Sequence, residues 1–280
     1  MEKLAKQIIA YGRVQGVGFR PSVCRFAMQY SLTGFVRNLG GCVEIIALGS
    51  FSACEAFVKA LYSIPEPAHI DRLEIKDLAL AEFAALYDAE AIARESFFAV
   101  ASTGGAESET VTADIGLCPT CQAELLNPQD RRYRYPYISC AQCGPRYTIM
   151  ERMPYDRINT TMKRYNMCPD CEEEYKNMLA RRGHGETISC HHCGPQLYGY
   201  AKDSDLKLDA DKALVKAQEL LLAGKIVMVK AVGGYNLVCR ADNDTVVAEL
   251  RALKHRPTKP FAVMCRDIEA VERLCQFSAK

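Results

Sequence analysis

The stretch AKQIIAYGRVQGVGFRPSVCRFAMQY, residues 5–30, decides the fold of the first part of the chain. Residues 5–13 alternate roughly between apolar and polar side chains, as a half-buried β-strand does. A glycine-rich loop follows at residues 14–20, and Pro21 then suits the first turn of a helix, where its missing N–H has no partner. Such a loop presents backbone N–H groups and the positive end of the helix dipole to an anion. Because Arg20 ends the loop and can bind phosphate in a bidentate manner, we predict a phosphate site here.

Further strands and helices follow this loop in the order β-α-β-β-α-β. Residues 34–38 and 42–48 are predicted to form a hairpin, and a helix at 51–64 and a strand at 70–78 come after it. This order is that of a ferredoxin-like sandwich, which is an α+β fold. We therefore predict one such domain over residues 1–100.

The composition of the 280 residues excludes several classes of protein. Hydrophobic residues make up 49% and charged residues 25%, as in ordinary globular proteins of about two domains. The formal charge of +1 is not that of a dedicated nucleic-acid binder. No apolar run approaches the roughly 18 residues of a membrane helix, and the N-terminus lacks the apolar segment of a signal peptide. We expect a cytoplasmic protein that does not enter a membrane.

Cysteine is the exception, because the chain has 14 of these residues. A polar, glycine-rich linker at 101–112 leads into residues 113–200, which hold two copies of C-x2-C-x18-C-x2-C at an offset of 50 residues. Two pairs of thiolates at this spacing can complete a tetrahedron around zinc. We predict a tandem zinc-finger module with two structural Zn²⁺ ions, and reduced core cysteines or redox-active pairs are the alternatives. The predicted ligands are Cys118, Cys121, Cys140 and Cys143 in the first finger, and Cys168, Cys171, Cys190 and Cys193 in the second.

Other polar residues of this module leave alternatives open. His191 and His192 lie inside a knuckle that four thiolates already close, so we interpret them as solvent-exposed bystanders. His184 is ambiguous on the same grounds. The basic run RRYRY at 131–135 is interpreted as a solvated strand face, with a nucleic-acid patch as the alternative.

Three motifs of the first domain together resemble the acylphosphatase family. They are VQGVGFR at 14–20, GFVRN at 34–38 and GCVEI at 41–45. The resemblance implies that Arg20 and the loop bind phosphoryl oxygens, that Asn38 orients the attacking water, and that no catalytic metal is needed. The alternative is that Arg20 and Asn38 only hold the fold. The loop consists of Val14, Gln15, Gly16, Val17, Gly18, Phe19 and Arg20.

An α/β pattern occupies residues 201–280. We predict helices at 209–224 and 243–254, a buried strand at 225–232 that a second strand follows, and a last apolar strand within KHRPTKPFAVM, residues 254–264.

The basic residues of this part suit the phosphates of a nucleotide. Lys254, Arg256 and Lys259 form the cluster, and an ordinary solvated loop is the alternative. KHRPTKPFAVM and KAVGGYNLVC (230–239) resemble the opening of YrdC-like domains, which bind ATP and form acyl-adenylates. Asn236 stands where that family usually has histidine.

The three parts in this order resemble the HypF family of carbamoyltransferases in [NiFe]-hydrogenase maturation. RRYRYPYISCAQCGPRYTI (131–149) and MPYDRINTTM (153–162) also look like its finger segments. The resemblance implies an N-terminal fragment of a multidomain enzyme, with an incomplete YrdC-like domain at 201–280. It implies that carbamoyl phosphate is hydrolysed at the acylphosphatase-like domain. In the full protein, ATP with Mg²⁺ would then form a carbamoyl-adenylate, and the carbamoyl group would pass to the C-terminal cysteine of HypE for cyanide synthesis.

A hypothesis from another class is a zinc-binding scaffold or nucleic-acid-binding module whose acylphosphatase-like domain is inert. The near-zero charge argues against a nucleic-acid partner. The presence of both Arg20 and Asn38 argues against inertness.

Overall fold

A computed structural model describes residues 3–87, 96–100, 102, 112–200, 207–231 and 233–276. The chain divides into two compact units, Met1–Gln196 and Leu197–Lys280. The linker predicted at 101–112 lies outside the described residues except for Ser102 and Thr112. Within the described ranges, no helix combines the length and the apolar character needed to cross a bilayer.

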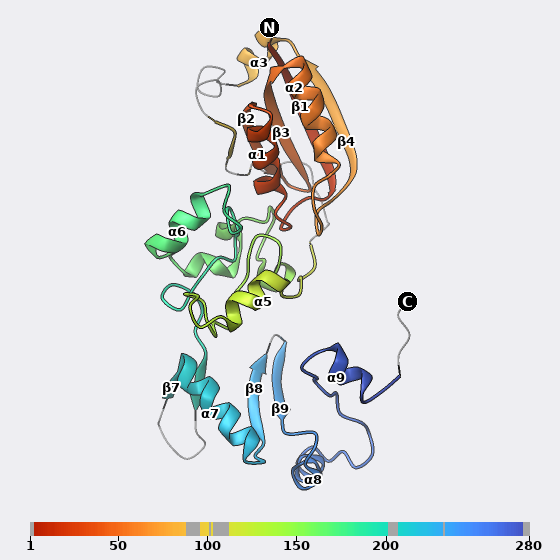
Figure 1. The fold of residues 1–280 in the computed structure, drawn as a ribbon, viewed down its shortest axis with the longest axis vertical. Coiled ribbons are helices and arrows are strands. Elements are labelled where there is room, and N and C mark those ends of the chain that lie inside the picture. Colours follow the sequence, from red (N-terminus) through yellow and green to blue (C-terminus); the bar gives the residue numbers. More distant parts are fainter. Residues whose placement is uncertain are drawn as a thin grey trace. The chain divides into compact units, whose positions relative to one another are not determined.

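The first unit begins with an antiparallel sheet to which one short parallel strand is added (Figure 1). Its strands lie in the order β4-β1-β3-β2-β5. Two helices connect the strands, so the first four strands and both helices have the predicted ferredoxin-like topology. The strands are β1 (Lys3–Arg13), β2 (Thr33–Leu39), β3 (Cys42–Ser50), β4 (His69–Leu78) and β5 (Phe98–Ala99), and the helices are α1 (Phe19–Gln29) and α2 (Phe51–Leu61).

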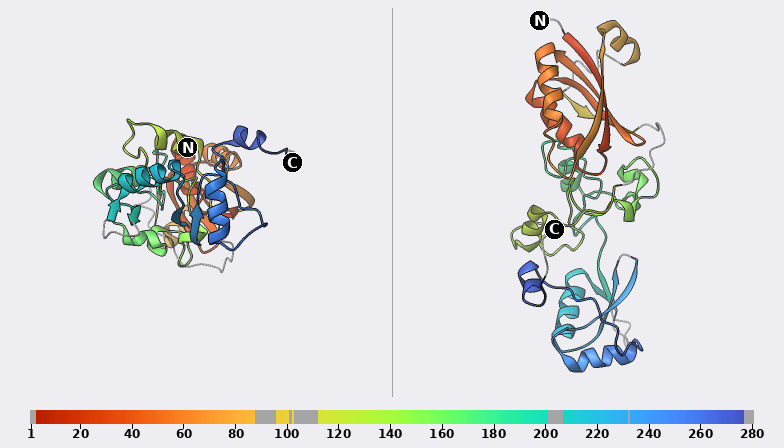
Figure 2. Two further views of the ribbon diagram at one scale, coloured as in Figure 1. Left: turned by 90° about the horizontal axis from the view of Figure 1, so that it is seen from below. Right: turned by 90° about the vertical axis from the view of Figure 1, so that its right-hand side faces the viewer.

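Both faces of this sheet are covered. Helices α1 and α2 lie side by side on one face (Figure 2), where Phe19, Val23 and Phe57 pack against buried strand residues such as Ile45. The short helix α3 (Leu80–Leu86) covers the other face through Phe83. Because the sheet has a core of its own, it fixes the ends of β1, β2 and α1, where the loop and Asn38 lie.

The finger module belongs to the same unit and consists mostly of turns. Helices α5 (Pro119–Leu126) and α6 (Pro169–Lys176) occupy equivalent places in the two repeats, and each begins at Pro directly after a cysteine. The connecting segment contains the 3₁₀ helices η1 (Tyr147–Ile149), η2 (Arg157–Asn159) and η3 (Thr161–Arg164). The interpretation of residues 131–135 as a strand face is wrong. Residues 131–134 form turns, and Arg131 and Arg132 bind Glu174 of the other finger.

The second unit contains two small antiparallel sheets and three helices among its described residues. The predicted helices are confirmed within a few residues. The strand predicted at 225–232 is present as well, but it is not buried as predicted, because its two-stranded sheet leaves Lys230, Met228 and Val229 exposed. The last apolar strand is wrong, because residues 254–264 adopt no strand and Met264 is 98% exposed. The elements are β6 (Tyr198–Tyr200), β7 (Lys207–Asp209), α7 (Ala210–Leu222), β8 (Val227–Ala231), β9 (Gly234–Val238), α8 (Asp244–Leu253) and α9 (Ile268–Glu272).

Candidate phosphate site and metal clusters

The glycine-rich loop joins β1 to α1 and turns through two left-handed residues. Gly16 has φ 69° and Gly18, the N-cap of α1, has φ 73°. Glycine adopts this conformation without the steric cost that a Cβ imposes. At Gly16 there is also no room, because a Cβ would lie 2.9 Å from Cδ of Arg146. The two glycines therefore allow the tight turn by which the chain enters α1, and phosphate binding by this loop stays a prediction.

Residues of the finger module form one wall of the loop. The buried Arg146 guanidinium donates hydrogen bonds to the Gly16 carbonyl and to the carbonyl of Ala141 at 3.0 Å. The backbone N–H of Tyr155 donates to Oε1 of Gln15 at 3.4 Å. The loop is thus held at Gly16 and Gln15 by residues more than 100 positions away in the sequence.

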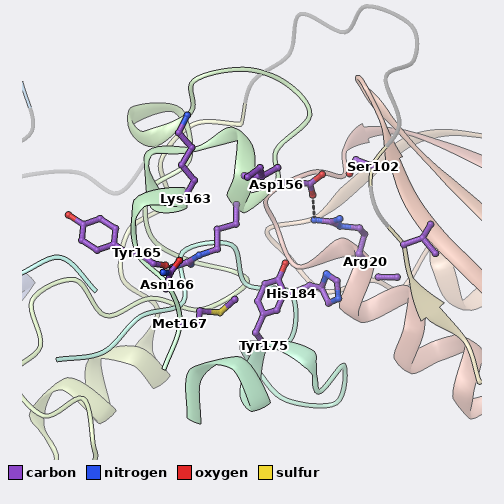
Figure 3. Close-up of a pocket in the computed structure, with 13 residues that line it drawn as sticks. Arg20, Ser102, Asp156, Lys163, Tyr165, Asn166, Met167, Tyr175 and His184 are labelled. Atoms are coloured by element: carbon purple, nitrogen blue, oxygen red, sulfur yellow. Dashed lines mark hydrogen bonds and ion pairs between the residues drawn. The ribbon is translucent and has the colours of Figure 1, made fainter. Parts of the chain in front are cut away.

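Arg20 lies in the first turn of α1, and its guanidinium is bound by two carboxylates of the finger module, of which Figure 3 shows Asp156. Its Nη2 lies 2.8 Å from Oδ1 of Asp156 and 2.8 Å from Oε1 of Glu186. Burial lowers the pKa of Arg20, but Glu186 and Asp156 outweigh this effect and hold the pKa above its ordinary value. The arginine is therefore charged and already in contact with oxygens of two carboxyl groups.

Asn38 lies near the end of β2 and reaches the same carboxylate. Its Nδ2 is 3.5 Å from Oδ1 of Asp156 and 3.5 Å from the carbonyl oxygen of Tyr155. Its buried Oδ1 has no hydrogen-bond partner within the described part of the chain. The structure therefore brings the two predicted catalytic residues, Arg20 and Asn38, to one carboxylate. Their roles in catalysis stay a prediction.

A cavity of about 480 Å³ opens beside Arg20 and Asp156. His184 and Tyr175 of the second finger line it and stack on each other with ring centroids 4.8 Å apart (Figure 3). The Nδ1 atom of His184 is buried and has no partner among the described residues. Burial, and next the charge of Arg20, lower the pKa of His184 to about 4, so the imidazole is neutral at pH 7.

The sequence did not predict most of the finger residues that contact the loop and Arg20. It assigned no role to Arg146, Tyr155, Asp156 or Glu186, and left His184 ambiguous. The available signal was that the first three lie in segments 131–149 and 153–162, whose overall resemblance to HypF fingers is visible in the sequence.

The eight cysteines gather into the two predicted groups of four. In the first, neighbouring Sγ atoms are 3.9 Å (Cys118–Cys140), 3.7 Å (Cys140–Cys143) and 3.6 Å (Cys143–Cys121) apart. Zinc–sulfur bonds of about 2.3 Å place the corners of a tetrahedron roughly 3.8 Å apart, whereas a disulfide needs about 2.05 Å. The donor set and its dimensions therefore fit zinc and exclude disulfides in this arrangement.

The second group has the same dimensions. Sγ of Cys190 lies 3.7 Å from that of Cys168 and 3.8 Å from that of Cys193. His191 and His192 are not among the clustered donors, and Nε2 of His191 instead lies 2.9 Å from the carbonyl oxygen of Tyr133.

Each finger donates arginine hydrogen bonds to the thiolates of the other. In one direction, Arg131 reaches Sγ of Cys171 at 3.4 Å, and in the other Arg181 reaches Sγ of Cys121 at 3.0 Å. The neighbouring arginines form a second reciprocal pair of contacts, this time with backbone carbonyls of the other finger. Arg132 donates to the Ser189 carbonyl at 2.9 Å, and Arg182 donates to the Ser139 carbonyl at 2.8 Å. The 50-residue repeat thus folds as a reciprocal pair.

The predicted nucleotide cluster lies in the second unit, after α8. Arg251 donates to the carbonyl oxygens of Arg256 at 3.3 Å and Lys259 at 3.2 Å, which fixes the backbone of this loop. The side chains of Lys254 and Lys259 are exposed. A nucleotide-binding role for Lys254, Arg256 and Lys259 stays a prediction. Asn236 lies in β9 opposite Val229 and is exposed.

Comparison with known proteins first gives the class of the N-terminal domain. The acylphosphatase family matches residues 6–85. The acylphosphatase of Mannheimia succiniciproducens is 43% identical over 75 residues, which cover 83% of that protein, and that of Thermococcus kodakarensis is 39% identical over 77 residues and 85% of its length. This part of the chain belongs to the acylphosphatase family, whose members are enzymes.

The remaining matches define the larger family. The HypF finger matches residues 117–150 and 167–199, and the Sua5, YciO and YrdC family ("Telomere recombination") matches residues 219–280. The probable carbamoyltransferase HypF of Methanocaldococcus jannaschii is 43% identical over 279 residues, 98% of this chain and 35% of its own. The chain belongs to the HypF family of carbamoyltransferases and spans about a third of the length of the relatives it matches.

Solved structures agree with this assignment. A crystal structure of full-length HypF in the phosphate- and nucleotide-bound form superposes with a TM-score of 0.85 at 37% identity, covering 99% of this chain and 35% of that one. The structure of T. kodakarensis HypF gives a TM-score of 0.84 at 41% identity, with 99% and 34% covered.

Proposed function

We propose that the acylphosphatase domain of this chain hydrolyses carbamoyl phosphate to carbamate and phosphate. The observation that supports this most strongly is that Arg20 and Asn38 converge on one anionic group at the N-terminus of α1. The site is therefore one that attracts oxyanions. Membership in a family of carbamoyltransferases favours carbamoyl phosphate among the acyl phosphates.

In the proposed reaction, water attacks phosphorus in line with the oxygen that links it to the carbamoyl carbon. The phosphorus–oxygen bond to the carbamoyl group breaks, carbamate leaves, and the proton of the water passes to phosphate or solvent. Arg20 and the loop N–H groups stabilise charge on the phosphoryl oxygens, and Asn38 orients the water. Catalysis then depends on orientation and fixed donors rather than on an ionised base.

The two cysteine groups have a structural role in this proposal. Cys118, Cys121, Cys140 and Cys143 would hold one Zn²⁺ and the equivalent four residues the other. Four thiolates leave no open coordination position, so the ions stabilise the fingers and activate no water. Reduced cysteines on this scale suit a cytoplasmic location.

For the whole protein we propose the carbamoyltransferase pathway. Carbamate would be adenylated with ATP and Mg²⁺ in the YrdC-like domain, to which Lys254, Arg256 and Lys259 would contribute phosphate contacts. The carbamoyl group would then pass to the C-terminal cysteine of HypE. The support is family membership and a solved relative that is described as phosphate- and nucleotide-bound.

The test of the proposal is phosphate release from carbamoyl phosphate by the wild type and by Arg20→Ala. Removing a charged donor at an oxyanion site is expected to lower kcat/KM by at least ~10²-fold. Arg25→Ala is the matched control, because Arg25 lies in the same helix and its guanidinium binds Ser22 at 2.8 Å instead. An Arg20→Ala variant within twofold of wild type would contradict the proposal, and a wild type without turnover would favour the inert scaffold.

A further inference from the structure

The carboxylate of Asp156 lies between the side chains to which the phosphoryl group and the water were assigned. Its Oδ1 is 2.8 Å from Nη2 of Arg20 and 3.5 Å from Nδ2 of Asn38. These are its side-chain hydrogen-bond and ion-pair partners within the described ranges. A carboxylate offers arginine the same kind of oxygen acceptor as a phosphoryl group. Asp156 therefore takes a place that a phosphoryl oxygen would need.

The second carboxylate, Glu186, is held differently. It accepts hydrogen bonds from the Tyr175 hydroxyl at 3.0 Å and the Arg157 backbone N–H at 2.9 Å, in addition to its contact with Arg20. Its side chain is 2% exposed, whereas that of Asp156 is 18% exposed and borders the cavity. Glu186 is thus a fixed part of the wall, and Asp156 is the carboxylate that has room to move.

Electrostatics forbids Asp156 and a phosphoryl dianion from sharing the site. One guanidinium, that of Arg20, already faces two carboxylates, and the neighbouring His184 is neutral at pH 7. A second anion beside Asp156 would be repelled in a poorly solvated place. The Arg157 guanidinium does not compensate for this, because it donates to backbone carbonyls of Glu186, Ile188 and Tyr165.

We propose that Asp156 is an internal occupant of the phosphate site, which a phosphoryl substrate displaces into the adjoining cavity before Arg20 and Asn38 act. This rests on the proposed function of Arg20. Phosphate then binds more weakly than it would to an open site. The apparent dissociation constant equals the intrinsic one divided by the fraction of molecules in which the site is open. Weak retention of phosphate would also speed release of that product.

The experiment is calorimetric titration of the 280-residue chain with inorganic phosphate. Asp156→Asn keeps the shape and removes the charge, so phosphate should bind about 10-fold more tightly than to wild type if the open fraction is near a tenth. Glu172→Gln is the matched control, because it removes one charge from the same finger module at an exposed position, where Glu172 pairs with Lys176 at 2.6 Å. This control should stay within twofold of wild type.

The phosphate titrations of the variants distinguish the two proposals. Equal or weaker phosphate binding by Asp156→Asn, with two zinc ions and an unchanged melting temperature, overturns the proposal. Asp156→Ala serves in its place if the amide variant does not fold, with the same expectation. If Arg20→Ala abolishes phosphate binding and both Asp156 variants bind phosphate like wild type, Asp156 does not occupy the phosphate site, and the proposed function of Arg20 stands. If Arg20→Ala leaves phosphate binding unchanged, or if no variant binds phosphate, both proposals are wrong.

Discussion

The guanidinium of Arg20 lies 2.8 Å from the carboxylate of Glu186, although 166 residues separate them in the sequence. One comes from the first helix of the acylphosphatase domain and the other from the second zinc finger. Both side chains are buried, so this contact is part of the interior rather than of a loose domain contact. The finger module is therefore a wall of the proposed phosphate site as well as a structural element.

Asn38→Ala should lower turnover more than it lowers phosphate affinity. The amide is assigned to the water and not to the bound anion, so its loss should appear mainly in kcat. Arg20→Ala should instead weaken binding and turnover together. Steady-state kinetics on carbamoyl phosphate, combined with phosphate titrations of both variants, separate the two roles. Equal losses of affinity in both variants would show that Asn38 binds the anion.

Loss of Arg181, which lies in the second finger, should weaken zinc binding in the first finger. Arg181→Gln removes a charge-assisted hydrogen bond to Cys121, a type of contact that contributes about 1.5–3 kcal/mol. Zinc should then leave the first finger faster, while Arg131→Gln should do the same to the second finger through Cys171. Zinc release to a chromogenic chelator measures both rates, with the exposed Arg164→Gln as a control. Release rates equal to wild type in both variants would show that the reciprocal contacts do not stabilise the metal sites.

His184 should make the first unit less stable as the pH falls below neutrality. Its pKa is about 4 in the folded state against an ordinary 6.5, so the unfolded chain binds more protons between these values. Stability is therefore complete above pH 6.5 and falls by about 2 kcal/mol on reaching pH 5. Urea unfolding at pH 7 and pH 5 should show this loss in wild type and a smaller one in His184→Gln. An identical change in the two proteins would refute the assignment.

The second unit should exchange its amide hydrogens faster than the first. Its described strands form only two-stranded sheets, which are marginally stable by themselves. It also exposes large apolar side chains, among them Met228 at 65% and Tyr235 at 68%. Hydrogen exchange read by mass spectrometry should show weak protection of β8 and β9 and strong protection of β1 and β3. Equal protection would contradict this account.

The fold was predictable where the signal is local. Alternation in residues 5–13, the loop at 14–20 and the spacing of the cysteines each act within one element or one repeat. The strands predicted in the basic run 131–135 and the apolar run 254–264 are absent from the structure. A strand requires a neighbouring strand, and no local pattern reveals whether one is present.

The wall of the site could not be predicted, since it depends on how the fingers fold over the loop. Asp156 and Glu186 look like ordinary surface acids in the sequence. Only the structure shows that both bind Arg20, with Glu186 buried and Asp156 partly buried, and that Arg146 fills the space beside Gly16. Buried charges of this kind depend on long-range pairing rather than on periodicity.

The most direct measurement of the central claim is a titration of the 280-residue chain with phosphate, followed by the backbone amide resonances of the ¹⁵N-labelled protein. We expect the largest shifts on residues 14–20 and on Asp156, and we expect them to vanish in Arg20→Ala. Unchanged resonances of residues 14–20 at phosphate concentrations that saturate any other site would contradict it.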